Sequence, residues 1–137
     1  MVIAKTIRLG LALGLLASLC AAAVPPVIPL GLWRNPDNSL QVRISECAAK
    51  LCGVIAWASE ASILDARESK IKEPLVGTQL LIDYHRASPA VWKGQVYVPD
   101  LGGSFYSRIT VKGPNTLDIA GCILGGLICK HQTWQRV

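Results

Sequence analysis

Short stretches of alternating apolar and polar residues fill most of the chain after residue 30, and this pattern constrains the fold more than any other feature. In residues 39–47, Leu40, Val42 and Ile44 fall on one face, with polar residues between them. Such alternation is typical of β-strands with one buried face. Many short strands joined by hairpins predict an antiparallel β-barrel or sandwich. The other strand-like segments are 52–58, 79–84, 91–100, 103–112, 116–122 and 130–137.

Residues 58–74 depart from this pattern because they are polar and charged. Ser62 and Asp65 are residue types that open a helix, and Pro74 is one that ends it. We therefore expect a long, partly helical loop of one or two helical turns. Long loops of compact domains are binding loops or lids, or they are solvated crossovers, and the sequence favours neither.

The first 23 residues have the order of a secretory signal peptide. Lys5 and Arg8 precede an apolar run at 9–20, and three alanines follow it. The apolar run is shorter than the roughly 20 residues of a membrane-spanning helix, and Pro25 prevents its extension. We expect cleavage after Ala23 and export to the periplasm or the medium, with no transmembrane segment in the mature protein.

Lipidation of Cys20 is the alternative to simple cleavage. In that case Cys20 would become the new N-terminus and carry the lipid. A lipidation motif places a small residue immediately before the cysteine, whereas Leu19 stands there, so the match is poor.

The expected mature protein, residues 24–137, has the size of a single domain. Removal of 23 residues from the 137 leaves 114, with 12 of the 14 basic residues and all 9 acidic ones, so the net charge falls from +5 to +3. The basic residues are scattered and form no run, which argues against nucleic acid as a partner.

Four cysteines remain after cleavage, in two closely spaced pairs. Cys47 and Cys52 flank AAKL, and Cys122 and Cys129 flank ILGGLI. These gaps do not fit zinc-site or thioredoxin spacing, and an even number of cysteines in an exported domain favours disulfides. In an antiparallel hairpin, residues that face each other across the loop are close enough to be bridged. We therefore expect Cys47–Cys52 and Cys122–Cys129, each worth about 2 kcal/mol.

No group of residues predicts catalysis, metal binding or a cofactor. Asp83 and His85 offer an acid and an imidazole, and His131 follows the second cysteine pair. There is no G-x-S-x-G motif, and a nucleophile, a base and an orienting group do not occur together. We interpret Asp83 and His85 as a surface polar pair and expect a protein that is not an enzyme.

The two ends of the mature chain carry a resemblance to lipocalin-type barrels. In those barrels a first-strand Trp packs beneath a last-strand Arg, and the cation–π contact closes one end. GLW at 31–33 and WQR at 134–136 are similar to that arrangement. The resemblance implies that Trp33 stacks with Arg136.

From residue 31 to 137 the chain also resembles a family of small exported bacterial proteins catalogued as domain of unknown function 2147. The matching pieces, in order, are GLWRN, CAAKLCGVIAW, PLVGTQLL, WKGQVYVPDLGGSFYS, LDIAGC and QTWQRV. The resemblance implies a lipocalin-like barrel of about eight strands. The 58–74 segment departs from the family, which tends to be richer in Asp, Asn and Pro there.

A barrel of eight strands is only just wide enough to be filled by side chains or to hold one small ligand. Trp57, Trp92, Trp134 and Tyr106 are candidates for lining such a cavity, although the favoured interpretation is that aromatic residues of this kind form ordinary core. We expect a non-enzymatic module that binds a small apolar ligand. The alternative is a cell-envelope interaction protein that contacts another protein or the membrane surface.

The loop between Cys122 and Cys129 is unusual because four of its six residues are aliphatic. Ile123, Leu124, Leu127 and Ile128 surround two glycines, whereas loops normally carry polar turn residues. Folding inward to plug the barrel end is the favoured expectation, since buried apolar area is stabilising. The alternative is an exposed contact loop that rims a ligand entrance or touches a partner or a lipid surface.

Overall fold

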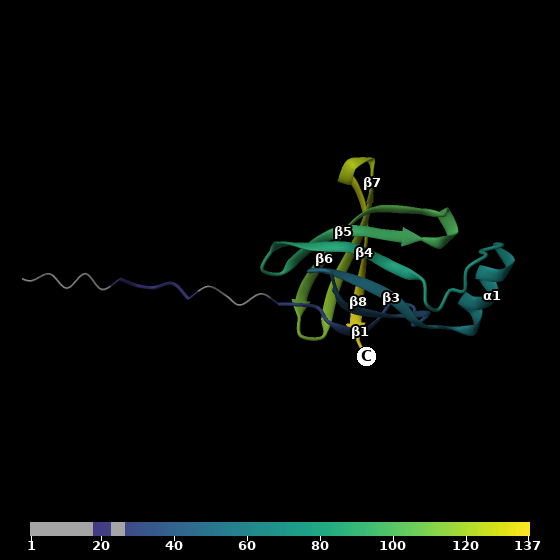
Figure 1. Ribbon diagram of the computed structural model, residues 1–137, viewed down its shortest axis with the longest axis horizontal. Coiled ribbons are helices and arrows are strands. Elements are labelled where there is room, and N and C mark those ends of the chain that lie inside the picture. The colour runs from purple at the N-terminus through teal and green to yellow at the C-terminus, as the bar shows by residue number, and fades with distance from the viewer. Residues whose placement is uncertain (1–17, 23–26) are drawn as a thin grey trace, which may run out of the picture.

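The computed structural model describes residues 18–22 and 27–137, and it shows eight antiparallel strands in one closed barrel (Figure 1). Each strand pairs with the next along the chain, and the first pairs with the last. The predicted lipocalin-like, all-β barrel is therefore confirmed. The strands are β1 (Gly31–Arg34), β2 (Leu40–Cys47), β3 (Lys50–Ala58), β4 (Gln79–Ser88), β5 (Val91–Val98), β6 (Gly103–Gly113), β7 (Thr116–Ile123) and β8 (Ile128–Arg136).

The connections alternate between two ends of the barrel because neighbouring strands run antiparallel. One end carries three two-residue turns, the start of β1 and the end of β8. Residues 27–30 are hydrogen-bonded to this end, and we call it the closed end. The other, the open end, carries the longer connections, which are 35–39, 59–78, 99–102 and 124–127.

The predicted signal peptide, residues 1–23, falls largely outside the described residues, so its cleavage stays a prediction. Within 18–22, Cys20 is exposed and forms no disulfide. No helix of the described ranges is long and apolar enough to cross a membrane.

The barrel interior is filled mainly by apolar side chains. Ile55, Leu81, Ile109 and Leu117 are almost completely buried. Burial of each such side chain contributes about 1.5–3 kcal/mol relative to exposure, so the interior supplies most of the driving force for folding. The core therefore runs through the centre of the barrel, as inward-facing residues of every strand require.

The polar excursion contains one helix, α1 (Glu60–Glu68), at the edge of the open end (Figure 1). Its N-cap is Ser59, whose hydroxyl accepts a hydrogen bond from the Ser62 backbone N–H at 3.1 Å. The expectation that Ser62 or Asp65 opens the helix is therefore wrong, because Ser59 is extended and its oxygen reaches the free N–H groups of the first turn. The helix also ends well before Pro74.

Both expected disulfides are present, but they sit differently in their hairpins. Cys122 and Cys129 are directly opposite each other, with their Cα atoms 4.1 Å apart. Cys47 faces Lys50 instead, and its bond to Cys52 runs diagonally over a Cα separation of 5.9 Å. The pairing is confirmed, whereas the expected facing geometry is wrong for the first pair. There, the two turn residues Ala48 and Ala49 have positive φ, and the register places Cys52 opposite Ser45, two residues before Cys47.

Two β-bulges change which side chains face inward. Along β4, the register shifts between Ile82 and His85, and Asp83 has a φ of 51°. Along β3, the register shifts beside Ala56, so that Ile55 faces Val42 and Trp57 faces Gln41. A bulge adds one residue to one strand and reverses the alternation beyond it. The first bulge turns Tyr84 into the barrel, and the second turns Trp57 out of it.

Candidate functional site

The closed end is a fully bonded structural cap. The indole N–H of Trp33 donates to the carbonyl of Pro29 at 3.0 Å, and that of Trp92 donates to the carbonyl of Val27 at 3.3 Å. Arg136 lies over the Trp33 ring, 4.2 Å from its centroid, in the arrangement expected from the sequence. Both tryptophans thus use their polar atoms to hold residues 27–30 beneath the barrel.

Arg136 is also tied to its surroundings by two backbone carbonyls. Its guanidinium donates to the carbonyl of Leu30 at 2.7 Å and to that of Pro114 at 2.9 Å. A second cation–π contact, which sequence reasoning missed, places Arg86 5.0 Å from the Trp92 ring centroid. The signal for it was a cationic residue just after the strand-like segment 79–84 and an aromatic residue at the start of the next one, 91–100.

The four aromatic residues predicted to line a ligand cavity are not brought together. Trp92 and Trp134 are core residues, and the indole N–H of Trp134 donates to Gln132 at 3.0 Å. Trp57 and Tyr106 are exposed on the outer surface of the barrel. The interior aromatic residue that sequence reasoning missed is Tyr84, because strict alternation from Leu81 would place it outside.

Tyr84 and Ser107 form an unusual pair inside the barrel. Both residues are completely buried, and neither hydroxyl has a hydrogen-bond partner among the described residues. The Tyr84 ring lies across Gly94, where a Cβ atom would come within 2.7 Å of it, so a side chain at Gly94 would displace the ring. Two unsatisfied hydroxyls in an apolar interior are costly, about 1–3 kcal/mol each.

Burial makes deprotonation of the Tyr84 phenol still less favourable than in water. Loss of solvation raises the pKa of its phenol far above the ordinary value, and the nearby Ser107 hydroxyl opposes this only in part. The two hydroxyls are therefore neighbours, although their geometry does not meet the criteria of a hydrogen bond. The phenol stays neutral at physiological pH and keeps a proton that it can donate.

Small residues continue this level of the barrel from β5 to β7. Gly94 pairs with Ser107 and Ser107 with Gly121, so three strands present one row, which ends at Lys130 on β8. Above Gly121, only a methyl group of Val96 would come within 4 Å of an added Cβ atom, at 3.5 Å. There is therefore room for a Cβ atom beside Gly121, whereas the Tyr84 ring fills the space over Gly94.

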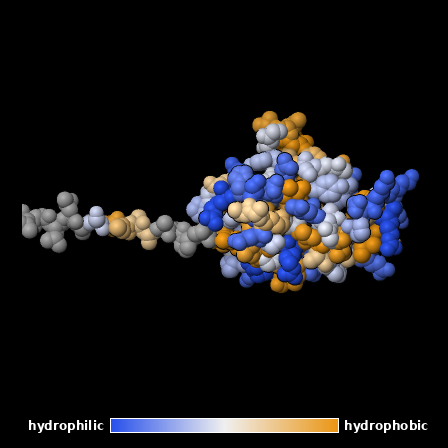
Figure 2. Space-filling model, viewed as in Figure 1, coloured by the Kyte–Doolittle hydropathy of each residue, from blue (hydrophilic) through white to orange (hydrophobic). Residues whose placement is uncertain are grey.

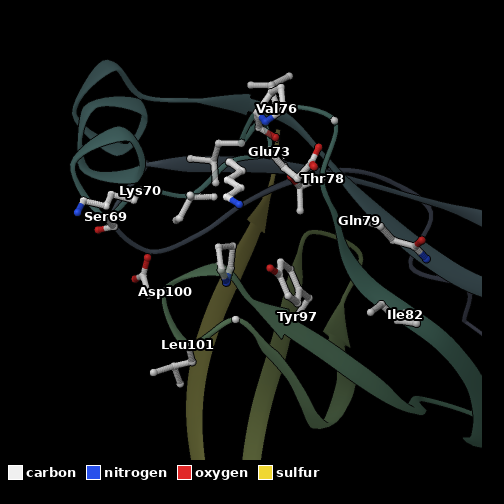
Figure 3. A pocket seen from close by; sticks show the side chains of 17 residues that line it. Ser69, Lys70, Glu73, Val76, Thr78, Gln79, Ile82, Tyr97, Asp100 and Leu101 are labelled. Atoms are coloured by element: carbon white, nitrogen blue, oxygen red, sulfur yellow. Dashed lines mark hydrogen bonds between the residues drawn. The ribbon is translucent and has the colours of Figure 1, made fainter.

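A groove of about 1100 Å³ lies outside the barrel at the open end (Figure 3). The segment that follows α1 forms one wall, with Lys70, Glu73 and Val76, and the β5–β6 connection forms the other. The Tyr97 side chain lies near the centre of the view, below Glu73 and Thr78. The groove is open to solvent and mixes charged and apolar side chains, so it lacks the dry, convergent polar groups of a tight small-molecule site.

The aliphatic loop contains the short 3-10 helix η2 (Leu124–Gly126). It projects from the open end as the knob at the top of Figure 2. Its side chains are exposed to 48% at Ile123, 67% at Leu124, 85% at Leu127 and 55% at Ile128. The favoured expectation, a plug inside the barrel, is therefore wrong. The Cys122–Cys129 bond clamps the loop at its base, and strand β8 begins only one residue after Leu127, so the tip stands clear of the interior.

The titratable residues singled out from the sequence lie on the outer surface. His131 and Asp118 form an ion pair of 2.9 Å on neighbouring strands. Asp83 and His85 are both exposed at the bulge of β4. No group of three metal-ligand side chains occurs among the described residues.

Comparisons with known proteins place this barrel in a family. Residues 31–136 match the family described as an uncharacterised protein conserved in bacteria, DUF2147. The fold is similar to that of protein HP1028 from the human pathogen Helicobacter pylori, which is described as belonging to the lipocalin family. That match has a TM-score of 0.61 at 18% identity and covers 81% of this chain and 84% of the other, so the likeness concerns the fold. The comparison with curated proteins found no match. Because the family match spans the whole barrel from β1 to the end of β8, the chain belongs to the DUF2147 family.

Proposed function

We propose that this protein is a non-enzymatic, exported binding protein. Its ligand would be a small, largely apolar molecule with one hydrogen-bonding group, taken up through the open end of the barrel. The observation that carries the proposal is the pair of buried hydroxyls, Tyr84 and Ser107, without a protein partner in an apolar interior. Buried polar groups are almost always paired, and exceptions commonly mark a bound molecule or water.

The surroundings of the pair suit such a ligand. Apolar side chains surround the two hydroxyls, and Gly121 leaves room for a Cβ atom next to Ser107. Pockets for small molecules combine an apolar lining with a few polar groups that fix orientation. The neutral phenol of Tyr84 can donate to a carboxylate, carbonyl or hydroxyl oxygen of the ligand, and Ser107 can donate or accept.

Export is supported by the disulfides. Cys47–Cys52 and Cys122–Cys129 are formed, and disulfides persist in oxidising compartments such as the periplasm. The likeness to a lipocalin-family protein supports the binding role only as an analogy of fold, since one fold serves many functions.

The binding test uses a dansylated fatty acid as a fluorescent probe. We expect Tyr84→Phe to weaken its affinity about tenfold, because the variant loses one buried hydrogen bond and keeps the ring. Ser107→Ala should act in the same direction. Tyr106→Phe is the matched control, since it removes the same hydroxyl from the outer surface and should leave the affinity unchanged.

Native mass spectrometry of protein isolated from its own host should also show a co-purified small molecule. If Tyr84→Phe and Tyr106→Phe bind the probe as tightly as the unaltered protein, the hydroxyl pair does not form the site. If Tyr84→Phe lowers stability and leaves binding unchanged, a structural water explains the pair better.

A further inference from the structure

We propose that the tip of the β7–β8 hairpin docks this protein on an anionic lipid surface. The docking surface consists of the loop residues Ile123, Leu124, Leu127 and Ile128, with Tyr106 beneath them and the cations of β5–β8 behind. It is independent of the ligand proposed above. It concerns where the protein works rather than what it binds inside.

The first argument is the exposure of the loop. Leu127 and Leu124 are 85% and 67% exposed, and the Cys122–Cys129 bond holds them in place. An ordered aliphatic tip costs free energy in water and has little conformational entropy left to lose on binding. Tyr106 lies directly under it, with its ring 3.8 Å from a Cβ built on Gly126. Tyrosine suits the boundary between headgroups and acyl chains because its ring is apolar and its hydroxyl polar.

The second argument is the shape of the surface. A stable protein interface takes roughly 20–30 residues from each side and needs a complementary face. The tip offers four aliphatic side chains on a narrow, convex knob (Figure 2). Lipid molecules can rearrange around a narrow projecting loop, and apolar side chains of interfacial segments enter the lipid layer by about 5–10 Å. The geometry therefore favours lipid over a protein partner.

The third argument is charge complementarity. From residue 101 to the C-terminus the chain has four Lys or Arg and a single acidic residue, Asp118, and two of these cations, Arg108 and Lys130, lie on the loop side of the closed end. Lys130 follows the loop by two residues and is exposed. One pleat below Tyr106, the strand register aligns a row of outward-facing residues across β4–β8, which is His85, Lys93, Arg108, Ala120 and His131.

The spacing of these parts matches the depth of a headgroup layer. Strands advance about 3.3 Å per residue, so Arg108 lies roughly 7 Å below Tyr106. With the aliphatic tip at the acyl boundary, Arg108 on the outer face of the sheet and the exposed Lys130 on its inner face would both lie at the level of the phosphates. Each Lys or Arg near an anionic membrane surface strengthens binding about fivefold. Asp118 is hydrogen-bonded to His131 on the neighbouring strand.

The experiment measures co-sedimentation of protein isolated from the exported fraction of its host with two kinds of vesicle. One contains phosphatidylglycerol and phosphatidylethanolamine, and the other contains phosphatidylcholine alone. We expect binding to the anionic vesicles that weakens at high salt. Leu124→Ser with Leu127→Ser should weaken it at least about tenfold, because both side chains lose their apolar burial. Lys130→Gln with Arg108→Gln should weaken binding to the anionic vesicles selectively.

Matched controls separate this surface from general stickiness. Leu64→Ser with Val76→Ser removes two apolar side chains of 48% and 45% exposure from another part of the molecule, and should bind as the unaltered protein does. All variants should melt at about the temperature of the unaltered protein, because every substituted side chain is exposed or partly exposed. Leu127→Trp should gain blue-shifted emission on vesicles and be quenched by brominated lipid.

Several outcomes would overturn the proposal. Absence of vesicle binding is one, and equal loss of binding in the control pair is another. If the loop variant instead abolishes a concentration-dependent dimer and no vesicle binding occurs, the tip is a self-association surface. A result of either kind leaves the internal ligand site untouched, because Tyr84 and Ser107 are tested separately with a soluble probe.

Discussion

The closed end of this barrel differs from its interior and its open end in how well the polar and apolar groups are satisfied. At the closed end, Trp33 and Trp92 are buried and their indole N–H groups are both hydrogen-bonded to residues 27–30. Inside the barrel two buried hydroxyls lack partners, and at the open end aliphatic side chains stand in water. A region whose groups are all satisfied is explained by stability alone. A region that leaves both polar and apolar groups unsatisfied indicates binding.

The largest effect should come from the aromatic centre of the closed end. Trp33→Ala removes a fully buried indole and its hydrogen bond to Pro29, and we expect a loss of about 3–5 kcal/mol in the free energy of unfolding. Urea denaturation measures it. Trp57→Ala makes the same chemical change at an exposed site and should cost much less. Similar losses for both would mean that the closed end is not the stabilising region.

A smaller effect should follow from the cation above that ring. Arg136→Ala loses the contact with Trp33 and the bonds to two carbonyls, and we expect about 1–2 kcal/mol. Arg136→Lys should recover only part of it, because the planar guanidinium is lost. Thermal melting detects the change, with exposed Arg34→Ala as the control. A melting temperature unaffected by either substitution at Arg136 would show that the chain ends do not close the barrel there.

The smallest effect near neutral pH concerns Tyr84. The sign of its stability change distinguishes an unsatisfied interior hydroxyl from the satisfied groups of the closed end. Tyr84→Phe should leave stability unchanged or raise it slightly near pH 7, because the hydroxyl it removes has no partner. A hydroxyl that is hydrogen-bonded in solution would instead make this variant less stable.

Alkaline pH enlarges the Tyr84 effect. Burial raises the pKa of the phenol in the folded protein above its value of about 10 in the unfolded chain. Below pH 10 the phenol is protonated in both states. As pH rises from there toward the folded-state pKa, only the unfolded chain loses the proton, so the free energy of unfolding falls. Above pH 10 the unaltered protein should lose about 1.4 kcal/mol per pH unit more than Tyr84→Phe. Urea titrations at several alkaline pH values measure this difference. Parallel curves for the two proteins would mean that Tyr84 is solvated.

Local features were predictable because they depend on neighbours in the sequence. Alternation identified the strands, and short hairpin loops identified both disulfides, since chain connectivity alone brings those cysteines together. The Trp33–Arg136 contact followed from a resemblance to lipocalins rather than from spacing. The helix was expected in the correct segment, but its cap was misplaced by three residues because several serines compete for that role.

The candidate site was not predictable because it depends on strand register. A bulge at Asp83 turns Tyr84 inward, and another beside Ala56 turns Trp57 outward, and neither is visible in the alternation. Each bulge reverses every side chain beyond it, so one unrecognised extra residue exchanges the inside for the outside. The aromatic residues chosen from composition were accordingly not those at the unsatisfied site.

The sequence by itself determined that the chain is built of short antiparallel strands and which cysteines are bonded, because periodicity and chain proximity are local properties. Tertiary structure alone decided that the hydroxyls of Tyr84 and Ser107 meet without partners, and that Leu124 and Leu127 point into solvent instead of plugging the barrel. Both outcomes depend on how much space the other strands leave. That space exists only once eight strands have closed and their side chains have filled the interior.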